Sequence, residues 1–218
     1  MPGFRVAIIP VTAFQQNCTV LFDEDSHEAV VFDPGGEPER IIDLLSRQGL
    51  ALRRILLTHG HLDHAGGAAA LQAAVNAPDK PRVEIWGPDA RDRFLLDHIE
   101  GQQAVLGLTG MGNVTPDRFL AEGDEFEFGA LRFDVLHCPG HTPGSVVYVE
   151  KTARLAIVGD VLFRGSVGRS DFPYGDGDLL ITGIKTKLLP LGDDIAFICG
   201  HGQGSTFGEE RRSNPFLQ

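Results

Sequence analysis

The segment Thr58–Gly67, which reads Thr-His-Gly-His-Leu-Asp-His-Ala-Gly-Gly, constrains this chain more than any other feature. Within six residues it holds three histidines and one aspartate, all able to bind a metal ion. The segment follows the apolar run Arg54–Leu57, which predicts a buried strand. His59 and His61 project to the same side of an extended backbone because they are two residues apart. Asp63 and His64 fall where the chain is expected to turn into a helix, so they can reach a second point nearby. A polar surface loop is the alternative reading of the segment alone.

Three more residues that can bind metal follow predicted strands. His141 lies in a turn-rich segment between two strands, Asp160 follows the apolar run Leu155–Val158 and Gly159, and His201 lies between two glycines after the run Ala196–Cys199. Each of them alone indicates only a polar turn. With the first segment they supply five imidazoles and two carboxylates, placed at successive strand ends. That set is sufficient for two metal ions that share one carboxylate.

Apolar periodicity and turn residues predict a chain that alternates strands and helices. This order favours an α/β arrangement of two sheets with outer helices, formed as a single domain over residues 1–218. We expect strands at Arg5–Pro10, Thr19–Phe22, Ala29–Phe32, Arg54–Leu57, Arg82–Trp86, Glu125–Phe128, Leu131–Leu136, Ser145–Glu150, Arg154–Val158 and Ala196–Cys199. We expect helices at Glu37–Gln48, Ala65–Val75, Pro88–Leu96 and Asp178–Leu189.

Composition excludes several classes of protein. The chain has 19 basic and 30 acidic residues and a net charge of −11, which argues against a nucleic-acid partner and against anionic lipid. Its apolar runs are shorter than the ~20 residues of a membrane helix. Its three cysteines have no Cys-x-x-Cys spacing, so we expect no disulfide framework and a cytoplasmic location.

The run His-x-His-x-Asp-His at residues 59–64 resembles the signature of the metallo-β-lactamase fold superfamily, and His141, Asp160 and His201 match its later ligand motifs in order. The resemblance extends from the turn Asp33-Pro34-Gly35 through His201. It implies a four-layer αββα sandwich with two mixed sheets and outer helices. It also implies two metal sites, one held by His59, His61 and His141 and the other by Asp63, His64 and His201. Asp160 would bridge the two ions, and Asp33 would orient the site by hydrogen bonds without binding metal.

Imidazole and carboxylate ligands without a thiolate suit two divalent ions. We expect zinc, with iron or manganese as the alternatives. Two such ions can hold a bridging hydroxide at neutral pH and polarise a carbonyl group. Asp63 is the expected orienter of that hydroxide, in addition to its role as a ligand. The sequence leaves the oligomeric state open.

The segment Gly165–Phe172 resembles the glyoxalase II branch of this superfamily, the hydroxyacylglutathione hydrolases, and the related persulfide dioxygenases. Phe14–Cys18 and Ser213–Phe216 resemble short bacterial members of the glyoxalase II-like group. This resemblance implies hydrolysis of a small-molecule acyl-thioester, with S-lactoylglutathione as the expected substrate. It also implies that Arg169 binds a carboxylate of the glutathione moiety; the alternative is an ion pair between Arg169 and Asp171. Only 17 residues follow His201, so we expect no C-terminal helical glutathione-binding domain. Substitute substrate contacts are expected from Tyr174, or from Arg91, Arg93 and Lys80.

The same ligands are compatible with other reactions of this fold. One is that of a mononuclear iron persulfide (sulfur) dioxygenase, which would use the same histidines with one site filled. Another is hydrolysis of a lactone or lactam. A binding role without catalysis would be indicated by loss of ligands, and all seven are present.

Overall fold

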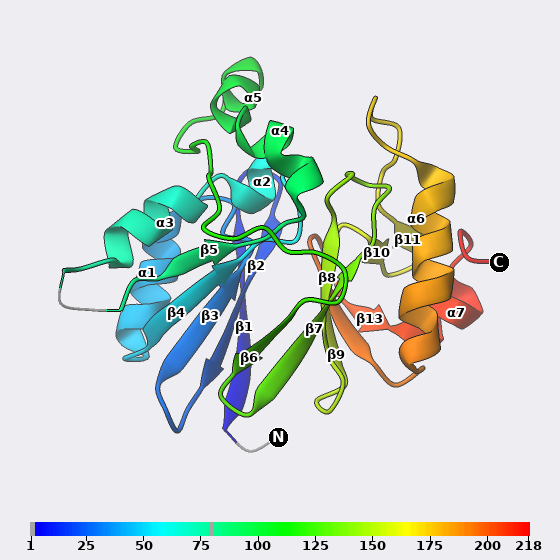
Figure 1. Ribbon diagram of the computed structural model, residues 1–218, viewed down its shortest axis with the longest axis horizontal. Helices are drawn as coiled ribbons and strands as arrows, with labels where there is room; N and C mark the ends of the chain where they lie inside the picture. The colour runs from blue at the N-terminus through cyan, green and yellow to red at the C-terminus, as the bar shows by residue number, and fades with distance from the viewer. Residues whose placement is uncertain (1–2, 79–80) are drawn as a thin grey trace. The chain divides into compact units, whose positions relative to one another are not determined.

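The computed structural model describes residues 3–78 and 81–218, and its chain divides into two compact units (Figure 1). The first comprises residues 1–87 and 93–119, and the second comprises residues 88–92 and 120–218. Within the described residues, every helix is too short or too polar to cross a membrane. Lys80 lies outside the described residues, so its expected substrate contact stays a prediction.

The first unit is built on a mixed five-stranded sheet of order β1-β2-β3-β4-β5. The first three strands are antiparallel neighbours, whereas β3, β4 and β5 run parallel. Parallel strands end at the same edge of a sheet, so the segments that leave β3 and β4 begin side by side. The strand bounds are β1 Phe4–Val11, β2 Gln16–Asp23, β3 Glu28–Phe32, β4 Ala51–Leu56 and β5 Glu84–Trp86.

Helices of the first unit pack on its sheet through apolar side chains. Ile41 of α1 (Pro38–Arg47) and Leu71 of α3 (Ala68–Val75) are fully buried in one core with Val31 and Ile55 of the sheet. Figure 1 shows these two helices side by side along the sheet. The remaining helices of this unit are α2 (Leu62–Ala65), α4 (Arg93–Leu96) and α5 (Ile99–Val105).

The second unit is built on a mixed six-stranded sheet of order β13-β12-β9-β8-β7-β6. Strands β9 and β12 run parallel, and the other neighbouring pairs are antiparallel. The bounds are β6 Glu125–Phe128, β7 Leu131–His137, β8 Val146–Glu150, β9 Leu155–Gly159, β12 Ala196–Cys199 and β13 Ser205–Thr206. A small hairpin of β10 (Leu162–Phe163) and β11 (Ser166–Val167) follows β9.

Two helices of the second unit share a core with its sheet. Leu180 of α6 (Gly177–Gly183) and Phe207 of α7 (Phe207–Ser213) are buried with Val147, Val158 and other sheet residues. The expected α/β class with two mixed sheets and helices is therefore confirmed.

Most predicted strands are present within a few residues, but several helices differ. The helix expected at Ala65–Val75 is divided into α2 and α3 at Gly66–Gly67. A β-carbon on Gly66 would lie 2.5 Å from the Leu62 carbonyl oxygen, and one on Gly67 would lie 2.6 Å from that of Pro34. The two glycines therefore let the backbones approach closely.

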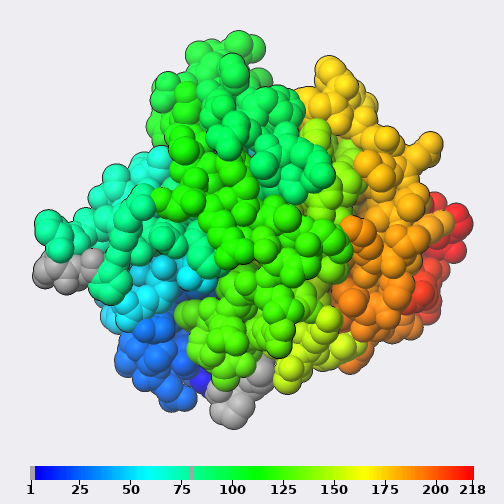
Figure 2. Space-filling model, viewed as in Figure 1, coloured from blue at the N-terminus to red at the C-terminus, as the bar shows by residue number. Residues whose placement is uncertain are grey.

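Two other helices also differ from expectation. The helix expected at Pro88–Leu96 forms as a 3₁₀ turn, Ala90–Asp92, followed by α4. The one expected at Asp178–Leu189 continues as a π-helical segment and a 3₁₀ turn through Leu191, so it does not end before Pro190. Helix α5 forms where the sequence analysis expected no helix, and the surface of the segment that carries α4 and α5 is green in Figure 2.

Candidate metal centre

In the first unit, the segment after β4 places His59 and His61 next to each other. The His59 Nε2 and His61 Nδ1 atoms are 3.1 Å apart. Two nitrogens that bind one zinc ion at 2.0–2.1 Å with tetrahedral geometry would lie ~3.3 Å apart. His59 is almost fully buried, whereas His61 is partly exposed. The pair therefore fits as two ligands of one cation.

Asp33 holds this segment from the neighbouring strand end. It follows β3 and is buried, with a left-handed backbone conformation (φ 50°) that aspartate tolerates better than most residues. Its carboxylate accepts hydrogen bonds from the Thr58 backbone NH at 2.7 Å and the Thr58 hydroxyl at 2.6 Å. It also accepts one from His64 Nδ1 at 2.9 Å. Three donors thus converge on one buried carboxylate.

These bonds determine which ring nitrogens can bind a metal. Because His64 Nδ1 gives its hydrogen to Asp33, His64 Nε2 keeps its lone pair. The Thr58 hydroxyl donates to Asp33, so its oxygen can accept from His59 Nδ1 at 3.1 Å, which leaves the lone pair of His59 on Nε2. Ligand atoms of Asp33, His59 and His64 all lie within 4.8 Å of one another. Asp63 lies in the first turn of α2, its Oδ2 4.0 Å from His64 Nε2.

In the second unit, Asp160 lies between two histidines. Its Oδ2 is 3.6 Å from His141 Nε2 and 3.5 Å from His201 Nε2. These separations match the ~3.4 Å expected between two ligand atoms of one tetrahedral ion. His141 Nδ1 donates to the Arg169 carbonyl at 2.7 Å, so Nε2 is again the nitrogen with the lone pair. The arrangement fits a carboxylate that can share a cation with either histidine.

The sheet explains why Asp160 and His201 meet. Strands β9 and β12 are parallel neighbours in which Gly159 is paired with Cys199. Asp160 follows β9 directly and His201 follows β12 after Gly200, so both leave the same edge. Gly168 packs closely against this segment, because a β-carbon on it would lie 1.9 Å from the Asp160 carbonyl oxygen.

The turn that carries His141 is held by Asp92, a residue that the sequence did not indicate. Asp92 is fully buried and belongs to the second unit. Its carboxylate accepts hydrogen bonds from the Thr142 hydroxyl and the Gly144 backbone NH, both at 2.6 Å. Because about 50 residues separate the partners, no local pattern could have shown the contact.

A cavity of about 710 Å³ opens on the second unit, within the size range of small-molecule sites. His141, Asp160 and His201 form part of its wall. The rest of the lining is Phe163, Arg164, Ser166, Val167, Arg169, Gly202 and Gln203.

Arg169 makes the ion pair that the sequence offered as an alternative to substrate binding. Its Nε and Nη2 atoms lie 3.0 and 3.1 Å from the two carboxylate oxygens of Asp171. Its guanidinium also lies 4.8 Å from the centre of the Phe172 ring. Hydrogen bonding to Asp171 raises the pKa of Arg169.

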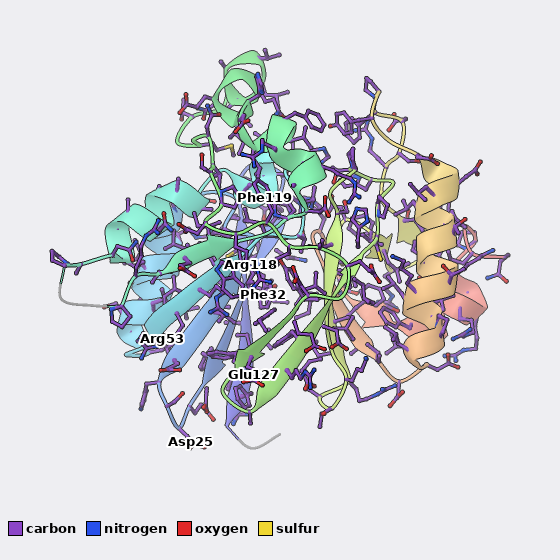
Figure 3. All side chains as sticks on the ribbon, in the orientation of Figure 1. Asp25, Phe32, Arg53, Arg118, Phe119 and Glu127 are labelled. Atoms are coloured by element: carbon purple, nitrogen blue, oxygen red, sulfur yellow. The ribbon has the colours of Figure 1, made fainter. Side chains whose placement is uncertain are left out.

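Tyr174 stacks on Phe172 at 5.4 Å and is absent from the described lining of the cavity. Burial raises the pKa of Tyr174 to about 12, so its hydroxyl is neutral at neutral pH. The expected contacts from Arg91 and Arg93 also have other partners in the structure. Arg91 pairs with Asp89, and Arg93 lies over the ring of Phe119, which is labelled in Figure 3.

All three cysteines are buried. Burial raises the pKa of Cys138 to about 12 and that of Cys199 to about 11. These thiols are therefore protonated at neutral pH and are poor nucleophiles.

Comparison with known proteins identifies the class to which this fold and these residues belong. The family profile of the metallo-beta-lactamase superfamily matches residues 11–201, so the chain is a member of that superfamily. Among the curated relatives, the chain is 47% identical to the hydroxyacylglutathione hydrolase GloC of Haemophilus influenzae, over 98% of both chains.

Two solved structures are also similar over nearly the whole chain. The BLEG-1 B3 metallo-beta-lactamase has a TM-score of 0.86 at 36% identity, and the match covers 98% of this chain and 99% of that one. TTHA1623, solved in a di-iron-bound form, has a TM-score of 0.84 at 36% identity, with 97% and 100% covered. The histidine and aspartate groups and the family together imply divalent metal ions.

Proposed function

We propose that this protein hydrolyses acyl-thioesters and that S-lactoylglutathione is its substrate. Membership of a metallohydrolase family supports hydrolysis in general. The observation that supports a thioester as the substrate is the 47% identity, along nearly the full length of both chains, to a hydroxyacylglutathione hydrolase.

Two zinc ions are the cofactors of this proposal. One would be held by His59, His61 and His141, and the other by Asp63, His64 and His201, with Asp160 available to both. Such ions would polarise the thioester carbonyl and lower the pKa of bound water towards neutrality. The close ring nitrogens of His59 and His61, and the central place of Asp160 between two imidazoles, support this assignment.

The protein's own groups orient the reactants. Asp63 accepts a hydrogen bond from the attacking water and so directs it at the carbonyl carbon. Asp33 and the Arg169 carbonyl hold His64 and His141 in the tautomers that metal binding requires. Arg169 and Tyr174 contact the thiol portion of the substrate in this proposal, and Arg169 would have to exchange Asp171 for a substrate carboxylate.

The test is hydrolysis of S-lactoylglutathione, with metal content measured on the same sample. We expect turnover with two zinc ions per chain. Asp160→Ala should abolish turnover and lower the metal content to one ion or fewer, whereas Asp97→Ala, at an exposed position, should match the wild type. Full activity in Asp160→Ala would show that the shared-carboxylate assignment is wrong.

Two alternatives have distinct outcomes in the same assays. One iron per chain, with oxygen uptake on glutathione persulfide, would replace the hydrolase by a dioxygenase; the di-iron form of TTHA1623 is the reason to measure iron. Rapid turnover of nitrocefin or a lactone, with weak thioester hydrolysis, would indicate a lactam or lactone hydrolase. The similarity to BLEG-1 is the reason to include those substrates.

The proposal places the protein in the cytoplasm, with a small-molecule substrate and neither nucleic acid nor membrane as a partner. The net charge of −11 and the lack of any Cys-x-x-Cys spacing among the three cysteines support this placement. Cell fractionation followed by immunodetection would test it.

A further inference from the structure

The cavity on the second unit has two arginines in its wall, and their charges are balanced differently. Arg169 makes a two-bonded ion pair with Asp171. Arg164 instead donates from Nη1 to the amide oxygen of Gln203 at 2.7 Å, which leaves its charge uncompensated by that contact. Among the described residues, Arg164 makes no ion pair within 4.0 Å. A carboxylate that enters the cavity would break no ion pair of Arg164, whose charge acts only from a distance on Glu209.

The hairpin that carries Arg164 is held by buried polar groups. Arg164 and Gly165 form the turn between β10 and β11, where Gly165 has φ +70°. The Gly165 backbone NH donates to Glu210 Oε2 at 2.7 Å, and Asn214 Nδ2 donates to the Ser166 carbonyl at 2.9 Å. Asn214 also donates to Glu210 at 2.9 Å.

Glu210 and Asn214 are both fully buried. Burying such groups is costly unless they are hydrogen-bonded. Glu210 Oε2 and Asn214 Nδ2 are bonded to this turn, whereas Glu210 Oε1 has no hydrogen-bond partner among the described residues. The turn is therefore held in one place, although the Arg164 side chain is exposed. This gives a role to Asn214, which lies in the terminal segment that resembled the glyoxalase II-like group.

The rest of the lining defines what can bind beside Arg164. Phe163 and Val167 give that wall an apolar part, while His141, Asp160 and His201 lie at the proposed reaction centre. A matching ligand has a reactive carbonyl, an apolar linker and an anionic end. A guanidinium is the side chain best suited to a carboxylate because it can form two parallel hydrogen bonds.

We propose that Arg164 is the residue that selects thioesters whose thiol portion carries a carboxylate, and that it contributes more to this selection than Arg169. The proposal rests on the proposed thioesterase function and names its substrate class. A carboxylated peptide thiol such as glutathione fits, and an uncharged thiol does not.

Binding is tested apart from catalysis with S-methylglutathione, which has no thioester to cleave. Calorimetric titration of the metal-loaded wild type, Arg164→Gln, Arg164→Lys and Arg169→Gln gives the four dissociation constants. We expect Arg164→Gln to weaken binding about fivefold, the upper range for a solvent-exposed ion pair. Arg164→Lys should recover part of the lost affinity, because lysine keeps the positive charge but cannot form the two parallel hydrogen bonds of a guanidinium. Arg132→Gln, an exposed arginine of the β6–β7 hairpin, is the matched control and should bind as the wild type does.

Kinetics then separate the substrate classes. Arg164→Gln should raise KM about fivefold for S-lactoylglutathione and leave KM unchanged for S-lactoyl-N-acetylcysteamine, which has no carboxylate. Equal changes for both substrates, or a larger effect of Arg169→Gln than of Arg164→Gln, would overturn the proposal. So would failure of the wild type to bind S-methylglutathione. Absence of thioester hydrolysis in the metal-loaded wild type would instead refute the proposed function, and the titrations would still decide the role of Arg164.

Discussion

Replacing Gly35 by alanine should disrupt the first unit at the place where Asp33 meets the segment that carries His64. The new β-carbon would lie 1.4 Å from the Asp63 carbonyl oxygen, 2.2 Å from its carbonyl carbon and 3.0 Å from the His64 nitrogen. Ordinary contact begins at 3.4 Å, so the two chain segments must separate by about 2 Å. All three atoms belong to the backbone of α2, so a change of side-chain rotamer cannot relieve the overlap. Overpacking of this kind costs 1–3 kcal/mol, and we expect about 3 kcal/mol or more here.

Separation of the segments should also affect the proposed metal centre. The 2.9 Å bond from His64 Nδ1 to Asp33 joins the two segments, so it would lengthen and His64 would lose its fixed orientation. We expect Gly35→Ala to lower Tm by about 6–12 °C and to reduce metal content. Scanning calorimetry and elemental analysis measure the two effects.

Gly101→Ala is the matched control. Gly101 lies within α5, and a β-carbon at this position would meet no neighbouring group within 4 Å. Alanine there should stabilise the protein by about 0.5–1 kcal/mol because of its higher helix propensity. The reasoning from this close approach would be refuted by a Gly35→Ala variant that keeps its full metal content and whose free energy of unfolding lies within about 1 kcal/mol of the wild-type value.

Three further predictions concern the buried carboxylate of Asp92, the buried thiols and the proposed metal sites. Asp92→Asn turns an acceptor of the Thr142 or Gly144 hydrogen bond into a donor; it should cost about 1–3 kcal/mol in unfolding free energy and lower kcat/KM, and an unchanged Tm would contradict this. Burial raises the pKa values of Cys138 and Cys199 from 9.0 to about 12 and about 11, so the unfolded chain loses these protons first. The free energy of unfolding should therefore be unaffected below pH 9 and fall above it, by up to about 1.4 kcal/mol per pH unit for each thiol. Urea unfolding from pH 8 to 10.5 measures this slope, which should be shallower in Cys138→Ala. Removal of metal by a chelator should lower Tm, and added zinc should restore it, because ions that bind only the folded state stabilise it. A Tm that changes in neither treatment would argue against the metal sites.

The local pattern was sufficient to predict most of the strands and to indicate the histidines and aspartates that we propose as metal ligands. Strands such as β3, β4 and β9 are short apolar runs bounded by turn residues, so their positions depend on neighbours in the chain. The parallel pairing of β9 with β12 explains why residues as distant as Asp160 and His201 could be predicted to meet. Helix extents were less predictable, because the break at Gly66–Gly67 depends on backbones that approach from elsewhere.

The sequence by itself determined the α/β class and the family, and it indicated which histidines and aspartates can bind metal, because side-chain chemistry and spacing are local properties. Only the tertiary structure decided how those side chains are held. Asp33 selects the tautomer of His64 from another strand end, Asp92 supports the turn of His141 from about 50 residues away, and Glu210 holds the hairpin of Arg164. These contacts join buried polar groups that are far apart in the chain. Burial without a partner would be costly, so each group was brought to its partner by the packing of the whole unit.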